Sequence, residues 1–181
     1  MKKNEKAEEI KLILLGESGV GKTSLIKRFL YDQFEPEISP SITMNFAQKE
    51  IYVDEKKIKL NIWDTIGQEK YRSLSKLFLN DTNIIILVYS ITDPHSFEEL
   101  SYWNQLYKEK LGDKTILGVV GNKADLILEE KVTEGQGKEY AEKNNAIFAL
   151  LSAKDNKDEI DDYFKKLVSE YFERKNNGIH I

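Results

Sequence analysis

The chain has 181 residues, of which 40% are hydrophobic and 32% charged, and this composition predicts one globular domain with a hydrophobic core. The formal net charge is -4, with 27 Lys and Arg against 31 Asp and Glu, which argues against a broad nucleic-acid-binding surface. The absence of cysteine excludes disulfides, thiolate metal sites and a cysteine nucleophile, and two histidines are too few to favour a histidine-bound metal.

Targeting signals are absent from the first ten residues, MKKNEKAEEI, which are charged and lack both an apolar segment and the glycine that myristoylation requires. The longest apolar run, 84–91, has the length of a strand and is too short for a membrane span. We therefore expect a cytoplasmic monomer with one domain over 9–174, between flexible tails at 1–8 and 175–181.

Strands and helices alternate along the chain. A strand over 10–16 leads through a tight loop into a helix over 22–34, and 46–63 reads as two antiparallel strands joined by the polar residues 54–57. The remaining expected strands lie at 83–91, 115–122 and 146–151, and the remaining expected helices at 94–107, 133–145 and 158–175. The helix at 94–107 has Asp93 as its N-cap and Pro94 at its first position. The helix at 133–145 has Thr133 and Gln136 at capping-box spacing.

The order β-α-β-β-α-β-α-β-α-β-α, with a helix between the hairpin and the strand at 83–91, predicts an α/β fold. We expect a three-layer α/β/α architecture, in which a mostly parallel six-stranded sheet has one antiparallel edge strand and helices on both faces. Ligands bind beyond the carboxyl ends of the strands in such a sheet, so the polar loops that follow strands are the candidate sites.

The loop GESGVGKT, 16–23, matches the phosphate-binding pattern G-x-x-x-x-G-K-[ST] between a strand and a helix, which makes the expected fold that of a P-loop NTPase. Its backbone N–H groups and the helix N-terminus would surround phosphates, Lys22 would reach the outer phosphates, and the Thr23 hydroxyl would bind Mg²⁺. The residues expected to contact the nucleotide here are Glu17, Ser18, Gly19, Val20, Gly21, Lys22, Thr23 and Ser24.

The loop GNKAD places Asn122, Lys123 and Asp125 after a buried strand. A carboxylate there could accept hydrogen bonds from N1–H and the exocyclic amine of guanine, which adenine cannot supply, so this loop favours guanine over adenine. N-K-x-D alone is more often a turn, and its place after the fifth strand favours the base-reading role. The last strand is followed by Ser152, Ala153 and Lys154, where a backbone N–H could reach the base carbonyl.

A third loop begins at Asp64, which ends a strand and could hold Mg²⁺ through water. Gly67 could turn an N–H toward a terminal phosphate, and Gln68 has a donor and an acceptor with which to orient an attacking water. A solvated turn is the alternative interpretation.

These loops, in this order and over nearly the whole chain, resemble the Ras-superfamily small GTPases, and the segments KLNIW, KYRSL and LVYSIT are most similar to the Rab branch. The resemblance implies GTP or GDP and Mg²⁺ as ligands, and effectors, an exchange factor and a GTPase-activating protein as partners. It also implies that Phe34 stacks on guanine, that Ser41 closes over Mg²⁺ and the γ-phosphate, and that 69–79 is mobile. Phe46, Trp63 and Phe78 match an effector-contacting aromatic trio, the alternative being ordinary, partly buried aromatics.

The sequence differs from that family pattern in three places, and each difference leads to a further expectation. Ser41 keeps the hydroxyl of the family's threonine, with Thr43 as a competing candidate. Ile66 stands where the family normally has alanine, so either its bulk slows hydrolysis or switching, or its side chain points away without effect. No cysteine is present for prenylation; either the chain ends before a lipidated tail that would reach the cytosolic face of endomembranes, or the protein is not lipidated.

We therefore expect a guanine-nucleotide-dependent switch that slowly hydrolyses GTP, with Gln68, Lys22 and Gly67 as its catalytic residues and a role in vesicle traffic. One alternative is a module that binds GTP without hydrolysing it, and another is a different P-loop enzyme such as a nucleotide kinase. Preferential binding of ATP would favour the kinase, and failure to release phosphate would favour the module.

Overall fold

The computed structural model describes residues 7–35, 45–65, 79–155 and 157–178. Its sheet has the strand order β2-β3-β1-β4-β5-β6, and β2 pairs antiparallel with β3 while the other pairs are parallel. The predicted sheet, including its antiparallel edge strand, is confirmed. The strands are β1 (Glu8–Leu15), β2 (Asn45–Val53), β3 (Lys56–Asp64), β4 (Ile84–Ser90), β5 (Ile116–Asn122) and β6 (Ile147–Leu150).

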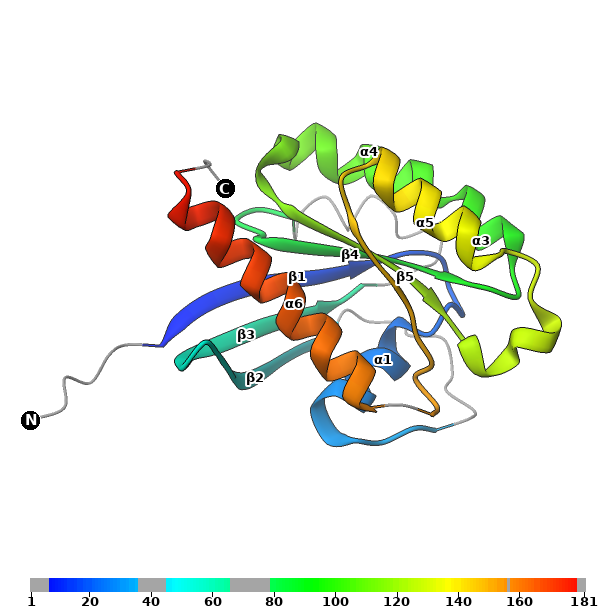
Figure 1. The fold of residues 1–181 in the computed structure, drawn as a ribbon, viewed down its shortest axis with the longest axis horizontal. Coiled ribbons are helices and arrows are strands. Elements are labelled where there is room, and N and C mark those ends of the chain that lie inside the picture. The colour runs from blue at the N-terminus through cyan, green and yellow to red at the C-terminus, as the bar shows by residue number, and fades with distance from the viewer. Residues whose placement is uncertain (1–6, 36–44, 66–78, 156, 179–181) are drawn as a thin grey trace, which may run out of the picture.

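Helices cover both faces of this sheet (Figure 1). On one face α1 (Lys22–Tyr31) and α6 (Lys157–Asn176) pack over a core that takes Leu12 and Leu14 from β1. On the other face α3 (Pro94–Glu98), α4 (Leu100–Leu111) and α5 (Glu134–Lys143) pack over a core that takes Ile13 and Leu15 from the same strand. Because successive side chains of a strand point to opposite faces, β1 contributes to both cores and the molecule has three layers.

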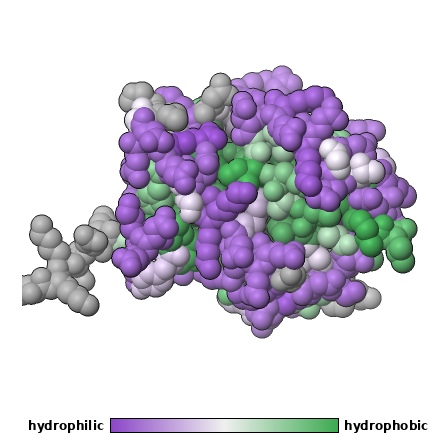
Figure 2. Space-filling model, viewed as in Figure 1, coloured by the Kyte–Doolittle hydropathy of each residue, from purple (hydrophilic) through white to green (hydrophobic). Residues whose placement is uncertain are grey.

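The central strands are apolar throughout because helices bury both of their faces. Every residue of β4 and β5 is buried, whereas all four residues of β6, an edge strand, are only half-buried. Figure 2 shows hydrophobic residues gathered over β6 between α5 and α6, with hydrophilic residues over most of the surrounding face. Two short 3₁₀ segments, η2 (Gly112–Lys114) and η3 (Ala124–Glu129), flank β5.

Three predicted boundaries were wrong. The hairpin turn is the two residues Asp54 and Glu55, both with positive φ, because Lys56 and the residue after it already pair with β2. The first helix ends at Tyr31, since Asp32 adopts a left-handed conformation with φ 55. The helix expected over 94–107 is divided at Glu99 into α3 and α4.

The expected helix caps are confirmed. The Asp93 side chain accepts a hydrogen bond from the His95 backbone N–H at 3.1 Å, with Pro94 at the first helical position. Thr133 and Gln136 form both bonds of a capping box at the start of α5.

Regular structure includes parts of the predicted tails, because β1 begins at Glu8 and α6 ends at Asn176. The helix predicted between the hairpin and β4 falls on 66–78, outside the described residues. None of the helices in the described ranges has both the length and the apolar character that a membrane span requires.

Candidate functional site

The carboxyl ends of four strands lead into the loops that the sequence singled out. β1 leads into the phosphate loop, 16–23, and β3 ends at Asp64. β5 ends at Asn122, and β6 is followed by Ser152–Lys154, called the base loop below. The parallel pairing of β1, β3, β4, β5 and β6 places these loops at one edge of the sheet, as the sequence predicted.

The phosphate loop approaches its neighbours so closely that two of its positions require glycine. Gly16 has φ 147, and a Cβ there would lie 2.2 Å from the Val88 carbonyl oxygen. Gly21 has φ 96, and a Cβ there would lie 2.2 Å from Nδ2 of Asn122. Gly21 is also the N-cap of α1 and has no side chain to cap the helix, which is the arrangement in which a helix N-terminus binds an anion.

Lys22 lies folded against this loop. Its Nζ donates to the carbonyl oxygens of Gly16 at 2.7 Å and Glu17 at 2.8 Å, and the residue is 6% exposed. Burial lowers the pKa of Lys22 to about 8, while the carboxylates of Asp64 and Glu17 act in the opposite direction. The ammonium is thus positioned by the carbonyls of its own loop, within reach of a phosphate bound there.

Thr23 and Asp64 form the pair expected to hold magnesium. The Thr23 hydroxyl donates to Oδ2 of Asp64 at 2.5 Å, and Asp64 is 3% exposed. Burial raises the pKa of Asp64, while the Thr23 hydrogen bond and the Lys22 charge lower it. Oδ1 of Asp64 is buried and has no hydrogen-bond partner among the described residues. A hydroxyl beside an unsatisfied carboxylate oxygen is a donor set that fits Mg²⁺.

The base loop positions the carboxylate of Asp125, the residue that was predicted to recognise guanine. Ser152 donates its hydroxyl to Oδ1 of Asp125 at 2.8 Å, and the same oxygen of Ser152 accepts from the N–H groups of Lys154 and Asp155, both at 3.2 Å. Nζ of Lys154 lies 3.9 Å from Oδ2 of Asp125. Lys123 adopts a left-handed conformation with φ 68, at the turn that leads from β5 into η3. Asp125 is therefore oriented by a neighbouring loop.

Asn122 joins the phosphate loop to the base loop. Its Nδ2 donates to the Val20 carbonyl oxygen at 2.8 Å, and its Oδ1 accepts from the Ala153 N–H at 3.3 Å. The sequence placed Asn122 in the nucleotide site, and the structure adds that it is the bridge between the two loops.

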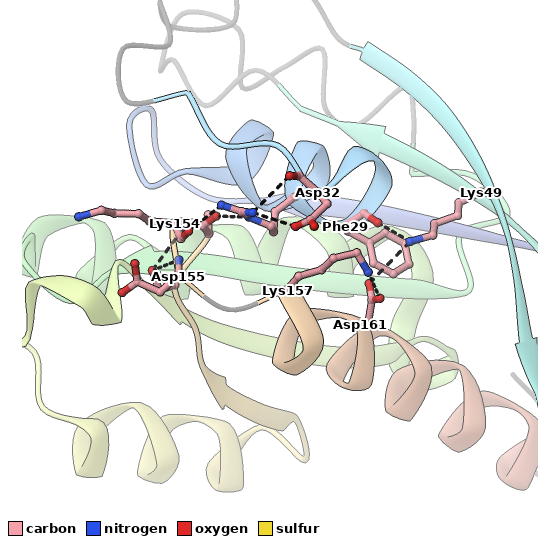
Figure 3. Close-up of polar contacts among 10 residues, drawn as sticks. Phe29, Asp32, Lys49, Lys154, Asp155, Lys157 and Asp161 are labelled. Atoms are coloured by element: carbon pink, nitrogen blue, oxygen red, sulfur yellow. Dashed lines mark hydrogen bonds and ion pairs between the residues drawn. The ribbon is translucent and has the colours of Figure 1, made fainter.

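Two further residues lie at the site without having been singled out for it. Trp103 of α4 donates its indole N–H to Oε1 of Glu17 at 3.1 Å, beneath the phosphate loop. Arg28 of α1 donates to the carbonyl oxygens of Ala153 and Lys154, and Figure 3 draws this group of contacts around Lys154 and Asp32. No local pattern marks either residue, because the partners are far apart in sequence.

Two of the three candidate effector contacts can be placed. Phe46 of β2 is 49% exposed, and its ring centroid lies 4.9 Å from that of Trp63 on β3. Lys11 lies over the Trp63 ring, with its Nζ 5.5 Å from the ring centroid. Phe34 is half-buried and packs against the core beneath α1 and α6.

Several predicted site residues lie outside the described residues, and the expectations for them remain predictions. These are Ser41, Thr43, Ile66, Gly67, Gln68 and Phe78, together with most of the segment 69–79. Thr65, the last described residue before Ile66, donates its hydroxyl to the Leu14 carbonyl oxygen at 2.6 Å. The start of the third loop is therefore fixed to β1.

A family model described as the Ras family matches residues 11–173 of the chain. The match runs from β1 to α6 and includes the phosphate loop, Asp64, Asn122 and the base loop.

Proposed function

Because the chain belongs to the Ras family, a family of guanine-nucleotide-binding switches, we propose that it is a Rab-like switch that hydrolyses bound GTP slowly. Members of this family are generally GTPases, typically bind Mg²⁺ with the nucleotide, and interact with effectors, exchange factors and GTPase-activating proteins. The Rab-like role and the slow hydrolysis are the parts that the proposal adds.

The Asn122 bridge is the observation that carries the proposal. One buried side chain contacts the backbone of both the phosphate loop and the base loop, so Lys22 and Asp125 belong to a single site. A molecule that fills this site has phosphates at one end and a base that offers two donors at the other, and guanine nucleotides have both.

In this proposal, each residue of the candidate nucleotide site has a separate role. Lys22, held by the carbonyls of its own loop, would place a positive charge where negative charge develops on the phosphates, and Thr23 and Asp64, which already contact each other, would hold the magnesium ion. The ion would supply further charge stabilisation at the phosphates. Gln68 would orient the attacking water, and Ser41 and Gly67 would respond to the γ-phosphate.

The Rab-like part of the proposal is supported by the aromatic surface on β2 and β3. Phe46 is exposed and stands against Trp63, so together they offer a partner an apolar surface with Lys11 at its side. We propose that effectors contact this surface when GTP is bound, and that the protein acts in the cytoplasm, or on the cytosolic face of endomembranes if its natural form carries a lipidated tail.

Two measurements test the proposed function. Nucleotide released from the purified protein and separated by chromatography should be GDP or GTP, and adenine nucleotides should not compete for the site. Single-turnover hydrolysis should release phosphate from bound GTP, and the Ile66→Ala variant should do so faster. Absence of phosphate release would show that the protein binds GTP without hydrolysing it. Equal hydrolysis rates in the parent and Ile66→Ala would show that Ile66 has no effect on hydrolysis. Preferential binding of ATP over GTP would reject the proposal.

A further inference from the structure

Arg28, in the last turn of α1, reaches three residues with one guanidinium. Its Nε donates to the Ala153 carbonyl oxygen at 2.8 Å and its Nη2 to the Lys154 carbonyl oxygen at 2.6 Å. Its Nη1 donates to Oδ1 of Asp32 at 2.8 Å. The Arg28 side chain is 14% exposed; its bond to Ala153 is partly buried, whereas its bonds to Lys154 and Asp32 lie near the surface.

This contact pattern needs the shape of an arginine. A guanidinium presents its donors in a rigid planar fork, so two of them can meet adjacent carbonyl oxygens while a third meets a carboxylate. A lysine ammonium on a flexible stem keeps the charge and lacks the fork. Hydrogen bonds from a charged donor are also stronger than those between neutral groups.

The base loop is held from both sides of its backbone. On its N–H side, Ala153 donates to Oδ1 of Asn122, and on its carbonyl side Ala153 and Lys154 accept from Arg28. The residue before them, Ser152, donates to Asp125. A chain of contacts therefore runs from Arg28 through the base loop to the carboxylate that reads the base.

The end of α1 that carries Arg28 is itself fixed in place. Nζ of Lys49 on β2 donates to the Phe29 carbonyl oxygen, lies 3.9 Å from the centroid of the Phe29 ring and pairs with Asp161 of α6 at 3.6 Å (Figure 3). The Phe29 ring stacks on Phe164 of α6, with centroids 4.1 Å apart. Because α1 is attached to both β2 and α6, Arg28 extends from a rigid support.

We propose that Arg28 is a positioning residue for guanine recognition: it holds the base loop so that Ser152 keeps Asp125 aligned with the base. This inference rests on the proposed function and assigns a role that the phosphate and base motifs do not contain. Arg28 touches neither nucleotide nor metal in this scheme, and it acts through the backbone of Ala153 and Lys154.

The test compares how fast two nucleotides leave the full chain. GDP and IDP differ only in the exocyclic amine of the base, so the ratio of their dissociation rates measures the contact made by Asp125. In the parent, IDP should leave faster than GDP by about tenfold, since one hydrogen bond to a carboxylate is lost. In Arg28→Ala, GDP should leave about tenfold faster than in the parent, and the IDP/GDP ratio should fall by at least about threefold.

Matched variants separate positioning from general stability. Arg28→Lys should give an intermediate GDP dissociation rate, which also covers the case in which Arg28→Ala fails to fold. Asp32→Gly removes the carboxylate without straining the left-handed backbone at this position, keeps both base-loop carbonyl contacts of Arg28, and should change the GDP rate by less than about twofold. Arg174→Ala removes another helical arginine that pairs with a carboxylate one turn away, Glu170 at 2.7 Å, and should leave both rates unchanged.

The outcomes are distinct. Equal acceleration of GDP and IDP in Arg28→Ala would overturn the inference, because a merely structural role would not change their ratio. An Asp32→Gly variant as fast as Arg28→Ala would also overturn it, because the base-loop contacts would then be irrelevant. If the parent binds no guanine nucleotide, the proposed function fails and this inference with it, whereas a parent that binds GDP with no change in Arg28→Ala rejects this inference alone.

Discussion

The phosphate loop and the base loop are built in different ways, although both surround one candidate nucleotide site. The phosphate loop places its own cation, because Lys22 bonds to carbonyls five and six residues back and Gly21 caps the helix that follows, while Asn122 and Trp103 add contacts from farther along the chain. The base loop is positioned from a distance, by Arg28, 125 and 126 residues away, and by Asn122, 31 residues away. A local motif can therefore carry phosphate binding, whereas base reading depends on the assembled fold.

The largest effect should come from removing the cation of the phosphate loop. Lys22→Ala removes the buried ammonium, and we expect GTP affinity to fall roughly 100-fold, because a charged hydrogen-bond donor to phosphate is lost. Equilibrium binding of a fluorescent GTP analogue measures this. Lys27→Ala is the control, because Lys27 lies on the same helix and pairs with Glu35 at 2.7 Å near the surface. A Lys22→Ala variant that binds as well as the Lys27→Ala control would contradict the assigned role.

The next largest effect should come from removing the side chain of Asn122, which joins the phosphate loop to the base loop. Asn122→Ala leaves the Val20 carbonyl and the Ala153 N–H without their partner, so we expect the free energy of unfolding to fall by about 2–4 kcal/mol. Dissociation of GDP should accelerate about tenfold, because the two loops lose their common support. Urea unfolding and GDP release measure the two effects. Unchanged GDP release would show that the loops hold their positions independently.

A smaller effect should follow from removing the support beneath the phosphate loop. Trp103→Phe loses the indole donor to Glu17, and we expect about 1–2 kcal/mol less unfolding free energy and about threefold weaker GDP binding. Leu106→Met, a buried change on the same helix that alters no polar group, serves as the packing control in both measurements. If Trp103→Phe lowers stability while leaving GDP affinity intact, the contact supports the fold and has no part in nucleotide binding.

The smallest effect on binding should come from a change far from both loops. Thr133→Ala removes the cap of α5, which should lower the free energy of unfolding by about 1 kcal/mol. GDP affinity, measured by calorimetry, should stay the same. This variant sharpens the comparison, because a loss of GDP affinity equal to that of Trp103→Phe would mean that binding merely follows overall stability.

Much of the fold was predictable because it follows from periodicity and local chemistry. The buried strands β4 and β5, the Asp93 cap and the capping box at Thr133 all depend on residues close together in sequence. The errors fall where one backbone conformation decides the outcome, as at Asp32, which ends α1 with φ 55. Nothing in the residues before Asp32 distinguishes that end from a continued helix.

The sequence by itself determined the three-layer fold and the place of the phosphate loop, because alternating apolar periods and a motif of eight consecutive residues are local information. It also identified Asn122, Asp125 and Ser152 as residues of the base site. Only the tertiary structure decided that Asn122 bridges the two loops, that Trp103 supports Glu17, and that Arg28 holds the base loop. These contacts join residues 31 to 125 positions apart, and only the packing of strands and helices against one another brings such residues together.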